Sequence, residues 1–206
     1  MDKVVTISRQ FGSGGREIGR KLAQKFNIPF FDNEIITRAA KESGFAETVF
    51  HNAESKATNS LLYSLAMGMT AYGGADTGFS TLSLDDQIYL AQAEVIRKVA
   101  DEGPCVIVGR CADYVLKGRS DVVNVFICAD IEFRKKRAIE VEHMSPDKID
   151  EAIKKIDKRR ANYYNYHSTE KWGRVENYNI ALKSSEIGID GCVDVIKSYI
   201  DFMCGK

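Results

Sequence analysis

The sequence predicts an α/β fold of three layers, in which helices cover both faces of a five-stranded parallel sheet. Short runs of β-branched and other apolar residues alternate along the chain with longer stretches of helical periodicity, which is typical of a parallel sheet. The chain has 206 residues, 44% of them hydrophobic, which is enough for one sizeable core. We therefore expect a single domain over residues 1–206.

The predicted strands are the short apolar runs, and the predicted helices are the periodic stretches between them. In chain order the strands are Val4–Ser8, Pro29–Phe31, Cys105–Val108, Val122–Ile127 and Tyr178–Leu182. The helices are Gly14–Phe26, Asp32–Ser43, Ser83–Glu102, Asp130–Glu142, Pro146–Tyr166 and Ile189–Met203. Two helix starts carry chemical signals. Ser83, three residues before Asp86, is an expected N-cap, and Ser145-Pro146-Asp147 places proline at the first helical position.

The segment from Asn59 to Thr81 breaks this alternation. It is rich in Gly, Ala, Ser and Met, and Asp76 is its one charged residue. We interpret it as an insert or a flexible excursion, and a contact in a homodimer is one role open to it.

Bulk composition excludes several classes of partner and location. The 29 basic and 29 acidic residues cancel, so a broad electrostatic surface for nucleic acid or an anionic membrane is not expected. No apolar run approaches the roughly 20 residues that span a bilayer, and the first residues lack the apolar core of a signal peptide. The five cysteines are widely spaced, without a C-x-x-C pair, so neither a disulfide framework nor a zinc site is indicated. A cytoplasmic protein is expected.

A glycine-rich turn, Gly12-Ser13-Gly14-Gly15, joins the first predicted strand to the first predicted helix. Glycines let the backbone approach a phosphate closely, while successive N–H groups and the positive helix end point at the anion. A tight turn that binds nothing is the alternative. The neighbouring Arg9, Arg16 and Arg20 favour phosphate binding, because guanidinium groups form forked contacts with phosphate.

The turn departs from the usual phosphate-binding motif, G-x-x-x-x-G-K-[ST]. Gly15 stands where that motif has its lysine, and Arg9 where it has its first glycine. Arg9 or Arg16 is expected to supply the missing positive charge. Glu17 is a candidate magnesium ligand, directly or through water, because Mg²⁺ prefers oxygen ligands. Alternatively, Glu17 only complements the dipole of the helix.

The opening segment 7–19 resembles the cytidylate kinase-like family, as do residues 106–112 and the tail segments 176–182 and 184–190. Three ordered blocks are more specific than any one of them. The resemblance implies a P-loop kinase core with an insert that binds the monophosphate, about residues 33–82, and a mobile lid, about residues 134–175. It further implies ATP and Mg²⁺ as cofactors, and CMP or dCMP as the phosphoryl acceptor.

The resemblance also implies an acceptor site. Asp32, at the end of the second strand, and Arg38, six residues later, match residues that hold the acceptor in cytidylate kinases. Asp130 matches an acid on the cytosine side, although an N-cap is its alternative role. Arg110 follows an apolar strand and is expected at the carboxyl edge of the sheet, where open α/β folds bind ligands. The kinases proper have an acid where this chain has Val108, which leaves one polar contact of the family in doubt.

Two basic clusters look like lid arginines. Arg134 and Arg137 lie three residues apart on one helical face, and Arg159 and Arg160 belong to a second cluster. Phosphoryl transfer depends on positioning and cationic stabilisation, which such arginines provide. Solvated helix faces, balanced by nearby acids, are the alternative. The predicted catalytic set is Arg9, Arg16, Arg134, Arg137, Arg159 and Arg160, and the predicted phosphate-binding set is Gly12, Ser13, Gly14, Gly15, Arg16 and Glu17.

The predicted activity is transfer of the γ-phosphoryl group of ATP to a nucleoside monophosphate, with small-molecule nucleotides as the substrates. One alternative keeps the fold and changes the acceptor to another small metabolite. A second is a nucleotide-binding sensor without catalysis, because the motif's lysine and hydroxyl are both missing.

Overall fold

The computed structural model describes residues 2–44 and 82–205. Within these ranges, five strands form one sheet in the order β2-β3-β1-β4-β5, and every pairing is parallel. The strands are β1 (Val4–Arg9), β2 (Phe30–Phe31), β3 (Val106–Val108), β4 (Val122–Cys128) and β5 (Ile180–Lys183). The predicted five-stranded parallel sheet is therefore confirmed. The segment 59–81, expected to be an insert or a dimer contact, lies outside the described residues.

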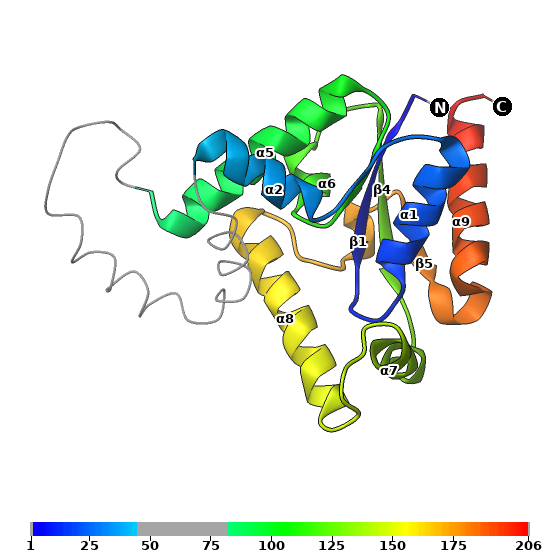
Figure 1. Ribbon diagram of the computed structural model, residues 1–206. Helices are drawn as coiled ribbons and strands as arrows, with labels where there is room; N and C mark the ends of the chain where they lie inside the picture. Colours follow the sequence, from blue (N-terminus) through cyan, green and yellow to red (C-terminus); the bar gives the residue numbers. More distant parts are fainter. Residues whose placement is uncertain (1, 45–81, 206) are drawn as a thin grey trace, which may run out of the picture.

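Helices cover both faces of the sheet. Figure 1 shows α1 (Gly15–Phe26) and α9 (Ser184–Met203) side by side on one face. The helices α2 (Glu34–Ser43), α5 (Leu84–Glu102) and α6 (Ala112–Val115) lie on the other. Beyond the end of β1 that leads into α1 lie α7 (Ile131–Glu140) and α8 (Ile149–His167). A short 3-10 turn, Val175–Asn177, precedes β5.

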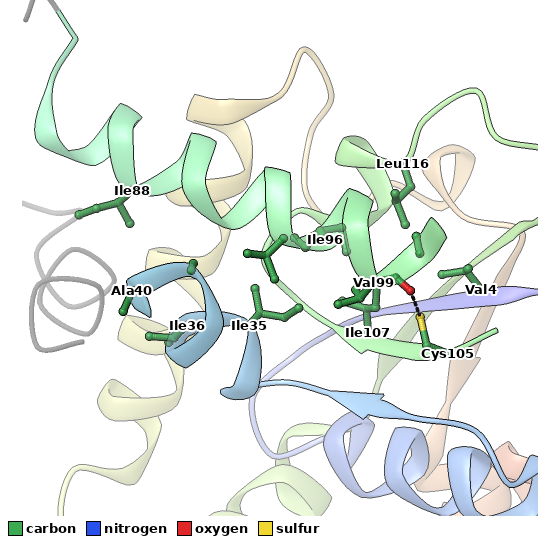
Figure 2. Packing of buried hydrophobic residues seen from close by; sticks show 14 residues of the cluster. Val4, Ile35, Ile36, Ala40, Ile88, Ile96, Val99, Cys105, Ile107 and Leu116 are labelled. Carbon is green, nitrogen blue, oxygen red and sulfur yellow. Dashed lines mark hydrogen bonds between the residues drawn. The ribbon is translucent and has the colours of Figure 1, made fainter. Parts of the chain in front are cut away.

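Side chains of the central strand alternate between two cores, as the period of a strand requires. Val5 and Ile7 pack with α1 and α9, whereas Val4 packs with α2 and α5. Figure 2 shows this second core, in which Ile35, Ile96 and Ile107 meet between the helices and β3. Because β1 is buried on both faces, its carboxyl end is a fixed platform for the residues that follow it.

Several predicted boundaries were wrong. Pro146 is not at the first helical position, because the Ile149 N–H donates to the Pro146 carbonyl oxygen at 3.3 Å and the helix begins only after this turn. α9 also contains a helical turn before Gly188, which was not predicted; the non-helical Gly188 (φ 72°, ψ 177°) separates this turn from the helix predicted to begin at Ile189. The short α6 was not predicted. The N-cap at Ser83 is confirmed, since its hydroxyl accepts the Asp86 N–H at 3.1 Å.

No helix within residues 2–44 and 82–205 is both long enough and apolar enough to cross a bilayer.

Candidate active site

The glycine turn lies between the end of β1 and the start of α1, and two of its glycines combine a left-handed backbone with close neighbours. Gly12 and Gly14 have φ angles of +76° and +79°, a region that side chains other than glycine rarely adopt. A Cβ at Gly12 would lie 2.5 Å from the Arg134 carbonyl oxygen, and one at Gly14 would lie 2.2 Å from Ile189 Cδ1. The turn is therefore packed closely between α7 and α9.

Some backbone N–H groups in this turn and beside it have acceptors within the protein, whereas those at the start of α1 have none within the helix. The Phe11 N–H donates to Asp157 Oδ1 at 2.7 Å, and the Ser13 N–H donates to the Gln10 carbonyl at 3.3 Å. The first α-helical bond is donated by Ile18 to Gly14, so the N–H groups of the first turn of α1 have no acceptor within the helix. These groups and the positive end of the helix form an anion-binding position.

Two cavities open at the carboxyl edge of the sheet. The first, which we call the phosphate cavity, has a volume of about 560 Å³ and includes the glycine turn. It is lined by Arg9, Gln10, Phe11, Gly12, Gly14, Gly15, Arg16, Glu17, Arg20, Asp32, Asn33, Arg110, Arg137, Val141, Glu142 and Arg160. Ser13 is not among these residues, because it is fully buried and its hydroxyl donates to the Gln10 carbonyl at 2.8 Å.

The second, which we call the aromatic cavity, has a volume of about 320 Å³ and lies between the ends of β1 and β3 and helix α8. It is lined by Ser8, Arg9, Gly109, Arg110, Cys111, Ile156, Arg159, Arg160, Tyr163, Tyr164 and Trp172. Among these described lining residues there are four arginines and no carboxylate. The aromatic cavity therefore combines the charge for a polyvalent anion with flat apolar surface for a ring.

Arg9 is held in a narrow space between two glycines. A Cβ on Gly15 would lie 2.6 Å from the Arg9 Cβ, and one on Gly109 would lie 2.1 Å from Arg9 Nη1. The Arg9 Nη2 lies 4.0 Å from Asp32 Oδ1. Burial lowers the pKa of the Arg9 guanidinium, with Asp32 acting in the opposite direction. Arg9 thus extends from the first strand into both cavities.

Arg110 lies on an unusual backbone segment. Three consecutive residues, Gly109, Arg110 and Cys111, have φ angles of 77°, 60° and 53°. Left-handed backbone at a residue other than glycine costs energy and is concentrated at functional sites. This segment directs Arg110 into both cavities, where burial lowers its pKa to about 10.

Helix α8 supplies the remaining arginines of the aromatic cavity. Arg160 donates from Nη1 to the Arg9 carbonyl oxygen at 3.1 Å. Burial, together with the charge of Arg9, lowers the pKa of Arg160 to about 9. Arg9, Arg110 and Arg160 consequently face each other in one desolvated cluster, which an anion would stabilise.

The acids of the phosphate cavity are paired with cations. Asp32, which is buried, accepts from Arg16 at 2.5 Å. Glu17 pairs with Arg137 Nη2 at 2.7 Å and with Lys21 at 3.6 Å. Within the described part of the chain, no three His, Cys, Asp or Glu side chains form a metal-binding group. The phosphate cavity therefore offers Mg²⁺ one or two carboxylates, and the phosphates of a bound nucleotide would supply further oxygen ligands, as is common in nucleotide sites.

Besides Ser13, three of the expected residues lie outside the cavities. Arg38 is on the surface of α2, where it pairs with Glu42 at 3.0 Å and Glu102 at 2.5 Å. Asp130 is exposed and pairs with Lys183 at 2.8 Å; its side chain makes no N-cap bond. Arg134 is buried behind the glycine turn, where its Nε donates to the Phe11 carbonyl at 2.6 Å.

Sequence reasoning missed Asp157, Gly109 and the contribution of Tyr163 and Trp172 to the aromatic cavity. Asp157 carried a usable signal, because it is the one acid in the basic stretch 154–160. The aromatic residues carried no such signal, because aromatic side chains on a helix pack in cores more often than they line cavities.

The fold and the site define the class of protein: a P-loop kinase-type α/β protein with a cationic two-cavity site. The chain belongs to the cytidylate kinase-like family, with a match over residues 4–186. This family supports nucleotide-dependent phosphoryl transfer. No curated protein matches the chain significantly.

Solved structures with a similar fold include an uncharacterized protein from Eubacterium ventriosum ATCC 27560. It is 28% identical, has a TM-score of 0.70, and the alignment covers 97% of this chain and 99% of that one. The shikimate kinase of Bacteroides thetaiotaomicron is 12% identical with a TM-score of 0.56, covering 98% and 99% of the two chains. That of Acinetobacter baumannii is 10% identical with a TM-score of 0.51, covering 100% and 94%. At such identities the shikimate kinases show the fold alone.

Proposed function

We propose that the protein transfers the γ-phosphoryl group of ATP to a nucleoside monophosphate, with CMP or dCMP as the acceptor. One observation carries this proposal: Arg9, Arg110 and Arg160 line both cavities. A phosphoryl group that moves between two bound anions needs cations at the boundary between them, because its charge spreads over its equatorial oxygens. Cytoplasmic location and dimer formation accompany this proposal as expectations from the sequence.

In this proposal the phosphate cavity holds the nucleotide triphosphate. The glycine turn and the first turn of α1 offer N–H donors, and Arg16 and Arg137 offer charge beside them. Arg9 takes over the electrostatic role of the missing lysine, from the opposite end of the turn. ATP brings the phosphoryl group, and Mg²⁺ offsets part of its charge. Glu17 is the proposed carboxylate for that ion, after exchange of its pairs with Arg137 and Lys21.

The aromatic cavity holds the acceptor. Arg110 and Arg159 hold its phosphate, and Tyr163 and Trp172 offer ring surface to its base. A base and a doubly charged phosphate together match the composition of this cavity better than an uncharged alcohol would. The arginines orient the acceptor oxygen toward the glycine turn, so no covalent intermediate with the protein is required.

The test is a kinetic assay with ATP and Mg²⁺ against a panel that contains CMP, dCMP, other nucleoside monophosphates and small hydroxylated metabolites. With CMP or dCMP, Arg110→Ala should raise the acceptor KM at least tenfold and lower kcat about 100-fold. The matched control is Arg97→Ala, which removes an exposed arginine on α5, and its constants should equal those of the wild type. Unchanged constants for Arg110→Ala would contradict the acceptor role.

The panel also separates the two alternatives. Val108, at the family's acid position, is compatible with a different acceptor. If a small metabolite is phosphorylated and CMP is not, the protein is a kinase with another acceptor. If ATP raises the melting temperature but no acceptor is consumed, the protein is a nucleotide-binding sensor.

A further inference from the structure

Phe11, directly before the glycine turn, contacts α7 and α8 through its N–H group, its carbonyl oxygen and its ring. Its N–H donates to Asp157 Oδ1 at 2.7 Å, and its carbonyl accepts from Arg134 Nε at 2.6 Å. Its ring packs in a small cluster with Ala138 of α7 and with Ile149 and Ile153 of α8. The position of the turn is thus set by these two helices.

Asp157 completes a closed ring of interactions. Its second oxygen pairs with Arg134, the same arginine that bonds the Phe11 carbonyl. Both side chains are largely shielded from water, with 16% of Asp157 and 9% of Arg134 exposed. Charge-assisted hydrogen bonds in such surroundings are strong and sharply oriented. The peptide units on both sides of Phe11 are therefore fixed by one ion pair.

The same carboxylate is close to the arginines of the aromatic cavity. Arg160 follows Asp157 by three residues on α8, so the two side chains lie on one face of the helix. Its Nη1 is 4.0 Å from Asp157 Oδ1 and also donates to the Arg9 carbonyl. The guanidinium of Arg160 further lies over the Phe11 ring, 5.6 Å from its centroid. One turn of α8 therefore contacts the glycine turn and presents the acceptor-side arginines.

We propose that Asp157 is a positioning residue that couples the two cavities. By holding α8 against Phe11, it fixes Arg159 and Arg160 relative to the N–H groups that bind nucleotide phosphate. Nucleotide bound in the phosphate cavity orders the turn, and through Asp157 it orders the arginines that receive the acceptor. The inference rests on the proposed function, because it assigns the two cavities to nucleotide and acceptor.

An ion pair that only joined α7 to α8 would make no contact with the residues of the glycine turn or with Phe11. The chain contains such a pair: Lys135 on α7 lies 2.8 Å from Asp150 on α8, and half of the Asp150 side chain is exposed. No contact of Asp150 with the turn is present among the described residues. Asp150→Ala is therefore the matched control for Asp157→Ala, because it removes an acid and an ion pair between the same two helices.

The experiment measures the Kd of CMP by titration calorimetry, with and without the β,γ-imido analogue of ATP and Mg²⁺. In the wild type, bound analogue should lower the Kd of CMP at least fivefold, as is usual for coupled sites. Asp157→Ala should bring this ratio close to one. Asp150→Ala should keep the wild-type ratio. Asp157→Asn, which keeps an acceptor for the Phe11 N–H but loses the charge, should give a reduced ratio.

A wild-type ratio of one, or a wild-type ratio in Asp157→Ala, would overturn the inference while leaving the kinase activity in place. If wild-type protein binds neither the analogue nor CMP, the proposed function fails, and the coupling fails with it. Melting curves without ligand show whether Asp157→Ala is folded. If it is not, Asp157→Asn decides, and an unchanged ratio in that variant overturns the proposal.

Discussion

The Arg16 Nε lies 2.5 Å from the Asp32 Oδ2, at the point where β2 ends beside the start of α1. Asp32 is 4% exposed, and it also lies 4.0 Å from Arg9. This one buried carboxylate consequently faces two arginines of the phosphate cavity. It limits the unfavourable charge that those arginines place in the protein when no anion is bound.

Asp32→Ala should lower the free energy of unfolding by about 2–4 kcal/mol, because it leaves the partly buried Arg9 and Arg16 without their neighbouring acid. The measurement is urea denaturation of the ligand-free protein. Asp190→Ala is the control: Asp190 pairs with Lys21 but is largely exposed, so its loss should cost less than about 1 kcal/mol. Equal losses in the two variants would show that Asp32 does not balance the arginines.

Gly15→Ala should reduce turnover at least tenfold, while the protein stays folded. Gly15 is the first residue of α1, where alanine has the better helix propensity. The added Cβ would nevertheless lie 2.6 Å from the Arg9 Cβ and displace that side chain. Kinetics and melting curves separate the two effects. Gly118→Ala, with no atom within 4 Å of the added Cβ, should affect stability through its φ of +90° and leave turnover unchanged.

Acid should destabilise the protein through His167. Its ring stacks on Tyr89 with centroids 4.1 Å apart, and burial lowers its pKa from 6.5 to about 4. Between these values the unfolded chain binds a proton that the folded protein does not, so the free energy of unfolding decreases as the pH falls. The loss due to this group should approach about 3 kcal/mol.

Urea denaturation at pH 6.5 and pH 4.5 measures this loss. His167→Phe keeps an aromatic ring and cannot bind the proton, so its stability should depend less on pH in this window. If the wild type and the variant lose the same stability, His167 is not the group responsible.

The sequence allowed the sheet and the glycine turn to be predicted because both depend on local patterns. A buried parallel strand is a short β-branched run, and the turn needs glycines at Gly12 and Gly14. Arg110 could be located for the same reason, because it directly follows a strand. The positions of these residues follow from their places in the sequence next to a predicted strand.

Other parts of the site depend on contacts between distant segments and could not be derived from spacing. Arg38 and Arg134 look equivalent in the sequence, yet one pairs with Glu102 on the surface and the other with Asp157 behind the turn. The choice depends on which acid the fold places beside each arginine. Asp157 and Phe11 are 146 residues apart, and no local pattern connects them.

The left-handed run Gly109-Arg110-Cys111 has a consequence for directed evolution of this protein. Glycine or asparagine at position 110 would relieve the backbone energy that arginine bears there. A library screened for heat resistance alone should therefore replace Arg110 early, whereas a library screened for turnover should retain it. A position at which those two selections diverge is one where turnover, and not stability, maintains the residue.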